Sequence, residues 1–237
     1  MSIEGKLIKV EIMAKEIERK YLVDLDKFYK SLITINEEGQ EVIGQDVKQA
    51  YLNNRNDWVV TLAPNRLVTI SSVSNNKVFY TQFNEKDTKQ LYEHESSKGR
   101  ISNGGVLTVN EDAWVARIRI YNEFSEDVYC EFCLKERKSG EERGECESEM
   151  DLSSALELYN SVGDRVSKTR FKYPYKGYIW DIDIFKDDNV GLHTGELETS
   201  DKEYPLPNFI GPELTNDERF YNDNLSRNPY KNWKYEF

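Results

Sequence analysis

The sequence predicts a mainly antiparallel β protein of the α+β class, with eight strands closed into a barrel and a few flanking helices. Short segments in which apolar and polar residues alternate outnumber segments with helical spacing. Within the alternating segments, charged residues recur at every second position, which places them on one face of each strand. A chain of 237 residues is also long enough to bury a sizeable core.

Eight alternating segments are the predicted core strands. In chain order they are 16–23, 47–52, 114–121, 128–135, 143–150, 166–173, 178–185 and 193–199. Three further segments, 25–32, 153–162 and 216–226, have helical character. The last follows Thr215-x-x-Glu218, which has the form of a capping box. We expect these helices to cover the outside or the ends of the barrel.

Residues 53–113 interrupt this order between the second and third core strands. Their apolar stretches predict two or three extra strands, and the polar run that leads to Gly104 and Gly105 predicts a mobile loop. The expected organisation is therefore a single tunnel-like domain over residues 1–237 with a β-rich insertion at about 53–113.

The charge balance argues against several classes of partner. The chain has 32 Lys and Arg against 43 Asp and Glu, a net charge of −11, and it contains no basic run. Bulk binding to nucleic acid or anionic lipid is therefore not expected. No stretch reaches the roughly 18 consecutive apolar residues of a membrane span, and no signal-peptide pattern is present. The three cysteines suit a reducing cytoplasm, and Cys130-x-x-Cys133 is interpreted as two ordinary strand cysteines.

The pairs and triples of charged positions are segregated by sign, with acidic ones on four strands and basic ones on two, to which Lys20 and Lys135 are added. Like charges crowded on a solvent-facing sheet repel one another, so the pattern favours an interior that binds a charged ligand. The acidic positions are Glu16, Glu18, Glu145, Glu147, Asp183, Glu196 and Glu198. The basic positions are Lys20, Arg117, Arg119, Lys135, Arg143, Lys168 and Arg170. Bases hold phosphate oxygens and clustered carboxylates hold Mg²⁺ or Mn²⁺, so the lining predicts phosphate chemistry.

The opening Glu16-Ile-Glu18-Arg-Lys20 resembles the E-x-E-x-K signature of the CYTH domain, or triphosphate tunnel metalloenzyme, family in its bacterial inorganic triphosphatase branch. Further matching motifs follow in the family's order over residues 15–229, the insertion excepted. They are Gln49-Ala-Tyr51-Leu52, Arg117-Ile-Arg119, a strand ending in Lys135, Arg143-x-Glu145-x-Glu147, Lys168-Thr-Arg170-Phe171, Asp183-Ile-Phe185, Gly195-Glu196-Leu-Glu198, Gly211-x-Glu213-Leu-Thr215 and Arg219-Phe-Tyr-Asn222.

The resemblance implies an eight-stranded tunnel that holds a triphosphate and one or two divalent cations. The seven acidic positions would be metal ligands and the seven basic positions would bind the phosphates. The implied catalytic residues are Lys20, Glu18, Glu145 and Tyr51. Glu18 or Glu145 would orient the attacking water, and Lys20 would stabilise charge on the phosphoryl group. Tyr51 matches a tyrosine near the signature lysine, and a buried core tyrosine is an equally good interpretation.

The predicted function is metal-dependent hydrolysis of inorganic triphosphate or a nucleoside triphosphate. Two alternatives stay open: a class IV adenylate cyclase that makes cyclic AMP, and a non-catalytic module that binds polyphosphate or nucleotide. An RNA 5′-triphosphate end ranks below a small-molecule substrate, because the basic residues of the insertion are dispersed. No membrane partner is expected, and a homodimer is left open.

Overall fold

The computed structural model describes residues 17–37, 42–53, 57–96, 101–137 and 144–233. Its main feature is a nine-stranded antiparallel sheet in the order β13-β1-β12-β11-β10-β2-β7-β8-β9. The strands are β1 (Ile17–Val23), β2 (Gly44–Leu52), β7 (Trp114–Tyr121), β8 (Tyr129–Glu136), β9 (Glu145–Glu149), β10 (Arg165–Tyr175), β11 (Tyr178–Phe185), β12 (His193–Thr199) and β13 (Ile210–Glu213). The predicted mainly antiparallel β fold is confirmed.

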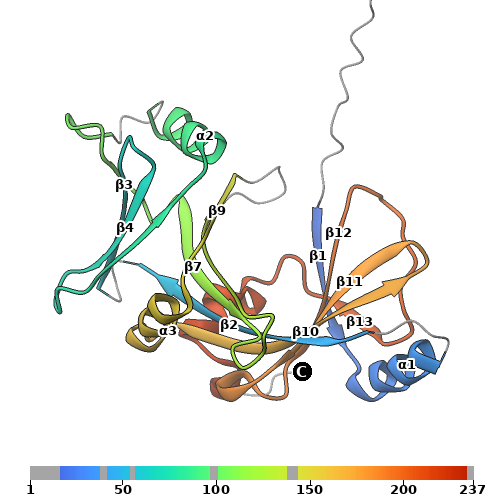
Figure 1. Ribbon diagram of the computed structural model, residues 1–237. Coiled ribbons are helices and arrows are strands. Elements are labelled where there is room, and N and C mark those ends of the chain that lie inside the picture. The colour runs from blue at the N-terminus through green and yellow to red at the C-terminus, as the bar shows by residue number, and fades with distance from the viewer. Residues whose placement is uncertain (1–16, 38–41, 54–56, 97–100, 138–143, 234–237) are drawn as a thin grey trace, which may run out of the picture.

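The sheet is strongly curved. Figure 1 shows β7 and β9 rising on one side and β1, β11 and β12 on the other, with β2 and β10 between them. In the described part of the chain, the end strands β9 and β13 do not pair with each other. Closure into a barrel therefore stays a prediction. The ninth strand, β13, was not predicted.

The core strands form where the alternation is strongest. Three of them, β7, β11 and β12, have the predicted bounds. Strands β10 and β11 are joined by Lys176 and Gly177, which have φ angles of 48° and 88°. Two successive residues with positive φ make the turn that suits the right-handed twist of a two-residue hairpin. This turn sets the register that pairs Arg170 with Asp183.

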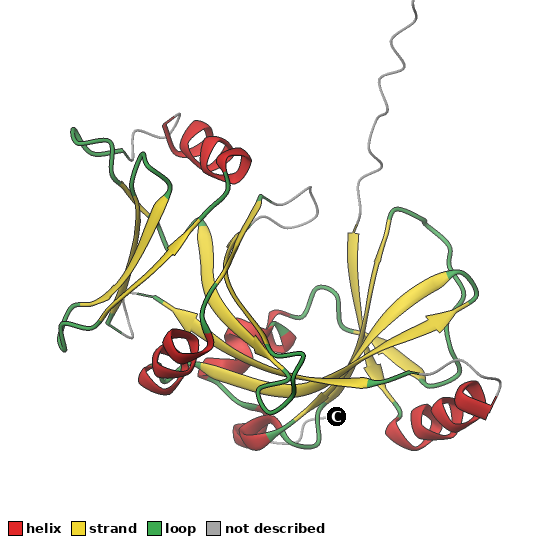
Figure 2. Ribbon diagram, viewed as in Figure 1, coloured by secondary structure: helices red, strands yellow, loops and turns green. Residues whose placement is uncertain are grey.

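Helices cover the apolar face of the main sheet, outside its curve (Figure 2). Helix α1 (Leu25–Glu37) inserts Phe28, whose ring makes edge contacts with Phe171, Tyr173 and Phe209. Helix α3 (Leu152–Ser161) begins at Asp151, whose carboxylate accepts from the Ser154 N–H, and packs on β7 and β8. Among the described residues, no helix is long and apolar enough to cross a membrane.

The segment between β2 and β7 forms a second antiparallel sheet and a helix. Its strands are β3 (Trp58–Leu62), β4 (Leu67–Ser72), β5 (Val78–Gln82) and β6 (Leu107–Thr108), in the order β5-β4-β3-β6. The predicted mobile loop is wrong over residues 85–96, which form helix α2 (Glu85–Ser96). Asn84 caps this helix by accepting from the Asp87 N–H, and Leu91 is fully buried in the core.

The C-terminal segment also differs from the prediction. Instead of one helix over 216–226 it forms the short helices η3 (Glu218–Phe220), α4 (Asn222–Arg227) and η4 (Tyr230–Asn232). The predicted capping box does not form, because the Thr215 hydroxyl accepts from the Lys20 N–H and donates to Glu213. Phe220 and Leu225 pack instead against Tyr51 of β2 and cover part of the charged face of the main sheet.

The two sheets share one hydrophobic core. Phe83, which follows β5, is 1% exposed and stacks on Phe132 of β8 with ring centroids 5.9 Å apart. Leu62, Ile70 and Leu91 belong to the same buried cluster. The insertion is therefore built into the fold of the main sheet.

This shared core predicts that Phe83→Ala destabilises the whole protein by about 3–5 kcal/mol, the usual cost of removing a buried aromatic ring. Phe124→Ala is the matched control because Phe124 is 91% exposed, and its effect should stay within about 0.5 kcal/mol. Urea unfolding of both variants measures the difference. A small effect of Phe83→Ala would mean that the insertion folds as an independent appendage.

Candidate functional site

The strand registers place the predicted charged residues on one face of the main sheet. Residues directly opposite each other on neighbouring strands share a face. Lys20 lies opposite Glu196, Glu196 lies opposite Asp181, and Arg170 lies opposite Asp183. The same face continues through Tyr51 opposite Arg117, Arg117 opposite Cys133, Cys133 opposite Glu147, and Lys135 opposite Glu145. The strand registers thus bring these charged positions onto one face of the sheet.

This charged face is the concave one. The Lys135 Nζ on β8 lies 4.0 Å from the Glu18 Oε2 on β1, although five strands separate β8 from β1 in the sheet. Such an approach requires the sheet to curve toward the charged side. The same ammonium lies 3.9 Å from the Glu145 Oε2 of β9. Carboxylates from opposite sides of the curve therefore meet at one lysine.

The first group of charges, the β10–β12 cluster, is centred on Arg170. Its Nε and Nη2 each donate at 2.6 Å to the two carboxylate oxygens of Asp183, and Nη1 and Nη2 also donate to Asp181 and Glu196. Lys168 contacts Asp183 at 2.6 Å, and both side chains are fully buried. Burial, and after it the Arg170 guanidinium, lowers the pKa of Lys168 to about 8. Both carboxylate oxygens of Asp183 thus accept hydrogen bonds from basic side chains.

Lys20 joins this cluster from β1. Its Nζ lies 2.7 Å from the Glu196 Oε1 and donates to the Phe220 carbonyl at 3.1 Å. Burial alone would lower the pKa of Lys20, but the Glu196 and Glu18 carboxylates raise it above its ordinary value. Burial acts to raise the pKa of Glu196, but the Lys20 ammonium and the Arg170 guanidinium hold it well below its usual range. Lys20 is therefore a fixed, charged ammonium.

The second group, the β7–β9 cluster, lies on the other side of the curve. Arg117 donates to Glu145 at 2.8 Å, and Arg119 donates to Glu131 at 2.9 Å. Burial acts to raise the pKa of Glu145, but Lys135 and Arg117 overcome it and lower the pKa. Burial, and after it the carboxylates of Glu131 and Glu145, raises the pKa of Glu147. Glu147 is thus a carboxylate crowded by like charges.

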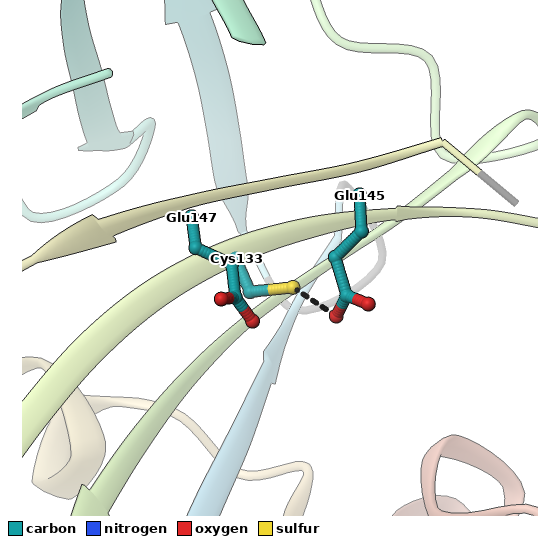
Figure 3. Close-up of side chains that lie close together, drawn as sticks. All are labelled: Cys133, Glu145 and Glu147. Carbon is teal, nitrogen blue, oxygen red and sulfur yellow. Dashed lines mark hydrogen bonds between the residues drawn. The ribbon is translucent and has the colours of Figure 1, made fainter. Parts of the chain in front are cut away.

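Figure 3 shows Glu145, Glu147 and Cys133 close together, with one ligand atom from each within 4.8 Å of the others. The Cys133 thiol donates to the Glu145 Oε1 at 3.1 Å, and burial raises the pKa of this thiol to about 12. A protonated thiol is a poor ligand, so the carboxylate oxygens are the donors that fit a cation here. Such a donor set suits a hard divalent ion such as Mg²⁺ or Mn²⁺.

The remaining predicted residues are placed as follows. Glu18 and Glu198 face each other on β1 and β12, and Glu198 is exposed. Tyr51 is buried beneath the C-terminal segment and its hydroxyl donates to Gln49 at 2.9 Å. Burial raises its pKa strongly. Glu16 and Arg143 lie outside the described residues.

The sequence prediction missed three side chains of the charged face. Asp181 bonds to Arg170, Glu131 bonds to Arg119, and Cys133 bonds to Glu145. The alternation contained the signal for all three, because Glu131, Cys133 and Lys135 are spaced two apart on one strand and Asp181 is two residues from Asp183 on another. Cys130 faces the opposite side and belongs to the apolar core, so the two cysteines do not act as a pair.

The concave face of the curved antiparallel sheet gathers clustered bases and acids, which are side chains of the kinds that bind phosphate oxygens and divalent cations. The chain is 32% identical over 142 residues to the inorganic triphosphatase of Acetivibrio thermocellus, a match that covers 58% of this chain and 87% of that protein. This chain belongs to the CYTH, or triphosphate tunnel metalloenzyme, family.

Other comparisons are more distant. No protein-family model matches the chain. The solved structure of the inorganic triphosphatase NE1496 has 18% identity and a TM-score of 0.47, with 90% of this chain and 95% of that chain covered. The protein PH1012 from Pyrococcus horikoshii OT3 has 16% identity and a TM-score of 0.37, with 78% and 80% covered. The family assignment therefore depends on the sequence match.

The buried ion pairs predict a large difference between two aspartates. Asp183→Asn leaves Lys168 and Arg170 buried without their shared anion, so we expect a loss of about 3–5 kcal/mol of unfolding free energy. Asp188→Asn is the control because Asp188 makes a surface pair with Lys231, and it should cost at most about 1 kcal/mol. Guanidinium unfolding of both variants tests this. Equal losses would show that the β10–β12 cluster does not stabilise the fold.

Proposed function

We propose that this protein hydrolyses a triphosphate, inorganic triphosphate first and nucleoside triphosphates second, on the concave face of its main sheet. The proposal treats the chain as one tunnel domain in which the curved sheet is the family's tunnel and residues 53–113 are an insertion. The observation that carries it is the single concave face on which basic and acidic clusters meet, with Lys135 near both Glu18 and Glu145. The inorganic triphosphatase relative supports the choice of substrate.

The substrate-binding groups of the proposal are the basic side chains of this face. Arg117 and Lys135 are well placed because both contact Glu145, whose charge the phosphates would replace; Arg117 is buried and Lys135 is partly buried. Guanidinium groups bind phosphate oxygens with two hydrogen bonds, and ammonium groups act as point charges. Arg119 lies beside them on β7, while Lys168 and Arg170 line the opposite side of the curve. We also assign Arg143 to this set from the sequence.

Carboxylates on both sides of the curve would hold the divalent cation. Glu145 and Glu147 are close together, and Glu18 shares the Lys135 ammonium with Glu145. Glu18 also lies opposite Glu198, a like-charge pair that a cation would relieve. The bound cation would neutralise phosphate charge and lower the pKa of a water molecule. We assign Asp183 to holding Lys168 and Arg170, and keep Glu16, Glu18, Glu145, Glu147, Glu196 and Glu198 as the proposed ligands.

The remaining chemistry would be done by the side chains of the face. Glu18 or Glu145 would accept a hydrogen bond from the attacking water and orient it in line with the scissile bond. Lys20, held by Glu196 and the Phe220 carbonyl, would stabilise the charge that develops on the phosphoryl oxygens. No covalent intermediate is required. Tyr51 would act indirectly, by positioning neighbouring groups, since its hydroxyl donates to Gln49.

Phosphate release from inorganic triphosphate, ATP and pyrophosphate, each with Mg²⁺ and with Mn²⁺, tests the function. We expect release from inorganic triphosphate to be fastest. Cyclic AMP and pyrophosphate from ATP, without phosphate, would instead identify a cyclase. Binding without turnover would identify a non-catalytic module.

Two variants test the role of the face. Lys20→Ala and Glu18→Gln should each lower the rate roughly a hundredfold or more, because both remove groups that act on the reacting phosphoryl group or the water. Lys30→Ala on the outer face of α1 and Glu126→Gln in the β7–β8 turn are exposed controls and should keep the wild-type rate. Thermal unfolding checks that each variant is folded. Wild-type rates in Lys20→Ala and Glu18→Gln would contradict the assigned site.

The requirement for a cation is tested by its removal. EDTA treatment should abolish phosphate release, and added Mg²⁺ or Mn²⁺ should restore it, because the carboxylates of the face bind hard cations. Activity that persists after chelation and dialysis would exclude the metal-dependent mechanism. Na⁺ at matched ionic strength is the control for screening of the charged face.

A further inference from the structure

Helix α2 of the insertion packs near one end of β9, the strand that carries Glu145 and Glu147 (Figure 1). On either side of β9, the Gly144 C=O accepts from the Glu136 N–H and the Met150 N–H donates to the Cys130 C=O, so the backbone groups of the even-numbered residues face β8. In an antiparallel pair the intervening residues direct their N–H and C=O groups away from the partner strand. The N–H of Glu147 and the C=O of Glu149 therefore point to the free edge.

The insertion supplies partners for both of these edge groups. The Asp87 Oδ2 in the first turn of α2 accepts from the Glu147 N–H at 3.4 Å. The Asp87 carbonyl also accepts from the Cys146 thiol at 3.6 Å. From β5, the Thr81 hydroxyl donates to the Glu149 carbonyl at 2.9 Å and lies 3.0 Å from the Ser148 hydroxyl.

Helix α2 is itself firmly anchored to the fold. The Trp114 Nε1 of β7 donates to the Glu95 Oε1 at 2.9 Å, and Leu91 is fully buried in the core. The helix comes so close to the start of β9 that a Cβ on Gly144 would lie 3.5 Å from the Gln90 Nε2 and 3.1 Å from the Trp114 ring. Asp87 therefore holds β9 against a rigid support.

We propose that Asp87 is a positioning residue for the cation site: through the free edge of β9 it fixes the directions of Glu145 and Glu147. This inference rests on the proposed function, because it takes these two carboxylates as cation ligands. An edge strand without partners frays, and carboxylates on a loose strand pay an entropic cost on binding a cation. The insertion would thus set the cation affinity of the site without contributing a ligand.

Direct Mn²⁺ binding to the full chain, measured without substrate by the loss of the free Mn²⁺ electron paramagnetic resonance signal, tests this. Asp87→Ala should raise the Mn²⁺ dissociation constant roughly tenfold, the usual cost of losing a residue that orients metal ligands. Glu85→Ala is the matched control. It removes an exposed acidic side chain from the same helical turn, and no contact of Glu85 with β9 is found in the described structure. Its dissociation constant should stay within about twofold of wild type.

Thr81→Val is a second, nearly isosteric variant, and it leaves the Asn84–Asp87 contact that caps α2 unchanged. It should also raise the Mn²⁺ dissociation constant, by a smaller factor than Asp87→Ala. A folded Asp87→Ala variant that binds Mn²⁺ as the wild type does would overturn the proposal. If Asp87→Ala does not fold, unchanged binding by Thr81→Val would overturn it.

Turnover separates this proposal from the proposed function. In steady-state assays, Asp87→Ala should raise the Mn²⁺ concentration for half-maximal rate and leave the KM for inorganic triphosphate at saturating Mn²⁺ nearly unchanged. A wild-type protein that binds Mn²⁺ through Glu145 and Glu147 but hydrolyses nothing would sink the hydrolase and leave the positioning role intact. Normal turnover by Asp87→Ala, with the metal dependence of the wild type, would overturn the positioning role and leave the hydrolase function intact.

Discussion

The structure depends on one electrostatic constraint: the charged side chains on the concave face of a curved sheet must neutralise one another. Burying an unpaired charge costs several kcal/mol, whereas a paired and hydrogen-bonded charge is tolerated. Arg170 meets this constraint by bonding Asp181, Asp183 and Glu196 at once. On one side of the curve Lys20 pairs with Glu196, and on the other side Lys135 lies near Glu145. This pairing stabilises the concave face.

The two clusters meet this constraint to different degrees. In the β10–β12 cluster, Lys168 and Asp183 are fully buried and contact each other at 2.6 Å, so burial fixes their positions. In the β7–β9 cluster, Glu145 is a third exposed and Glu147 is crowded by other carboxylates. Charges that are accessible and imperfectly compensated are the ones that gain most from a cation or a phosphate. Of the two clusters, the β7–β9 cluster therefore has the more accessible charges, and Glu18 of β1 approaches it through Lys135.

The insertion, residues 53–113, contacts the edge of β9 although the two are distant in sequence. Its second sheet and α2 complete the core behind β7 and β8, and its polar side chains satisfy the edge of β9. A sheet edge has unpaired backbone groups that must find partners or water. Here these partners are side chains of Asp87 and Thr81, so the strand with the crowded carboxylates is held on both sides.

The sequence by itself determined eight strands of the main sheet and the charged face of each, because period-two alternation fixes which side chains of a strand share a face, and its ordered motifs indicated the family. The bounds of β7, β11 and β12 followed from that spacing, whereas the strand registers placed Lys20, Arg170 and Glu145 on one common face. Only the tertiary structure decided which charge pairs with which, since Glu18 and Lys135 are remote in sequence and meet through curvature. It also decided that residues 85–96 form a helix, whose weak apolar pattern is stabilised by burial of Leu91 rather than by local spacing.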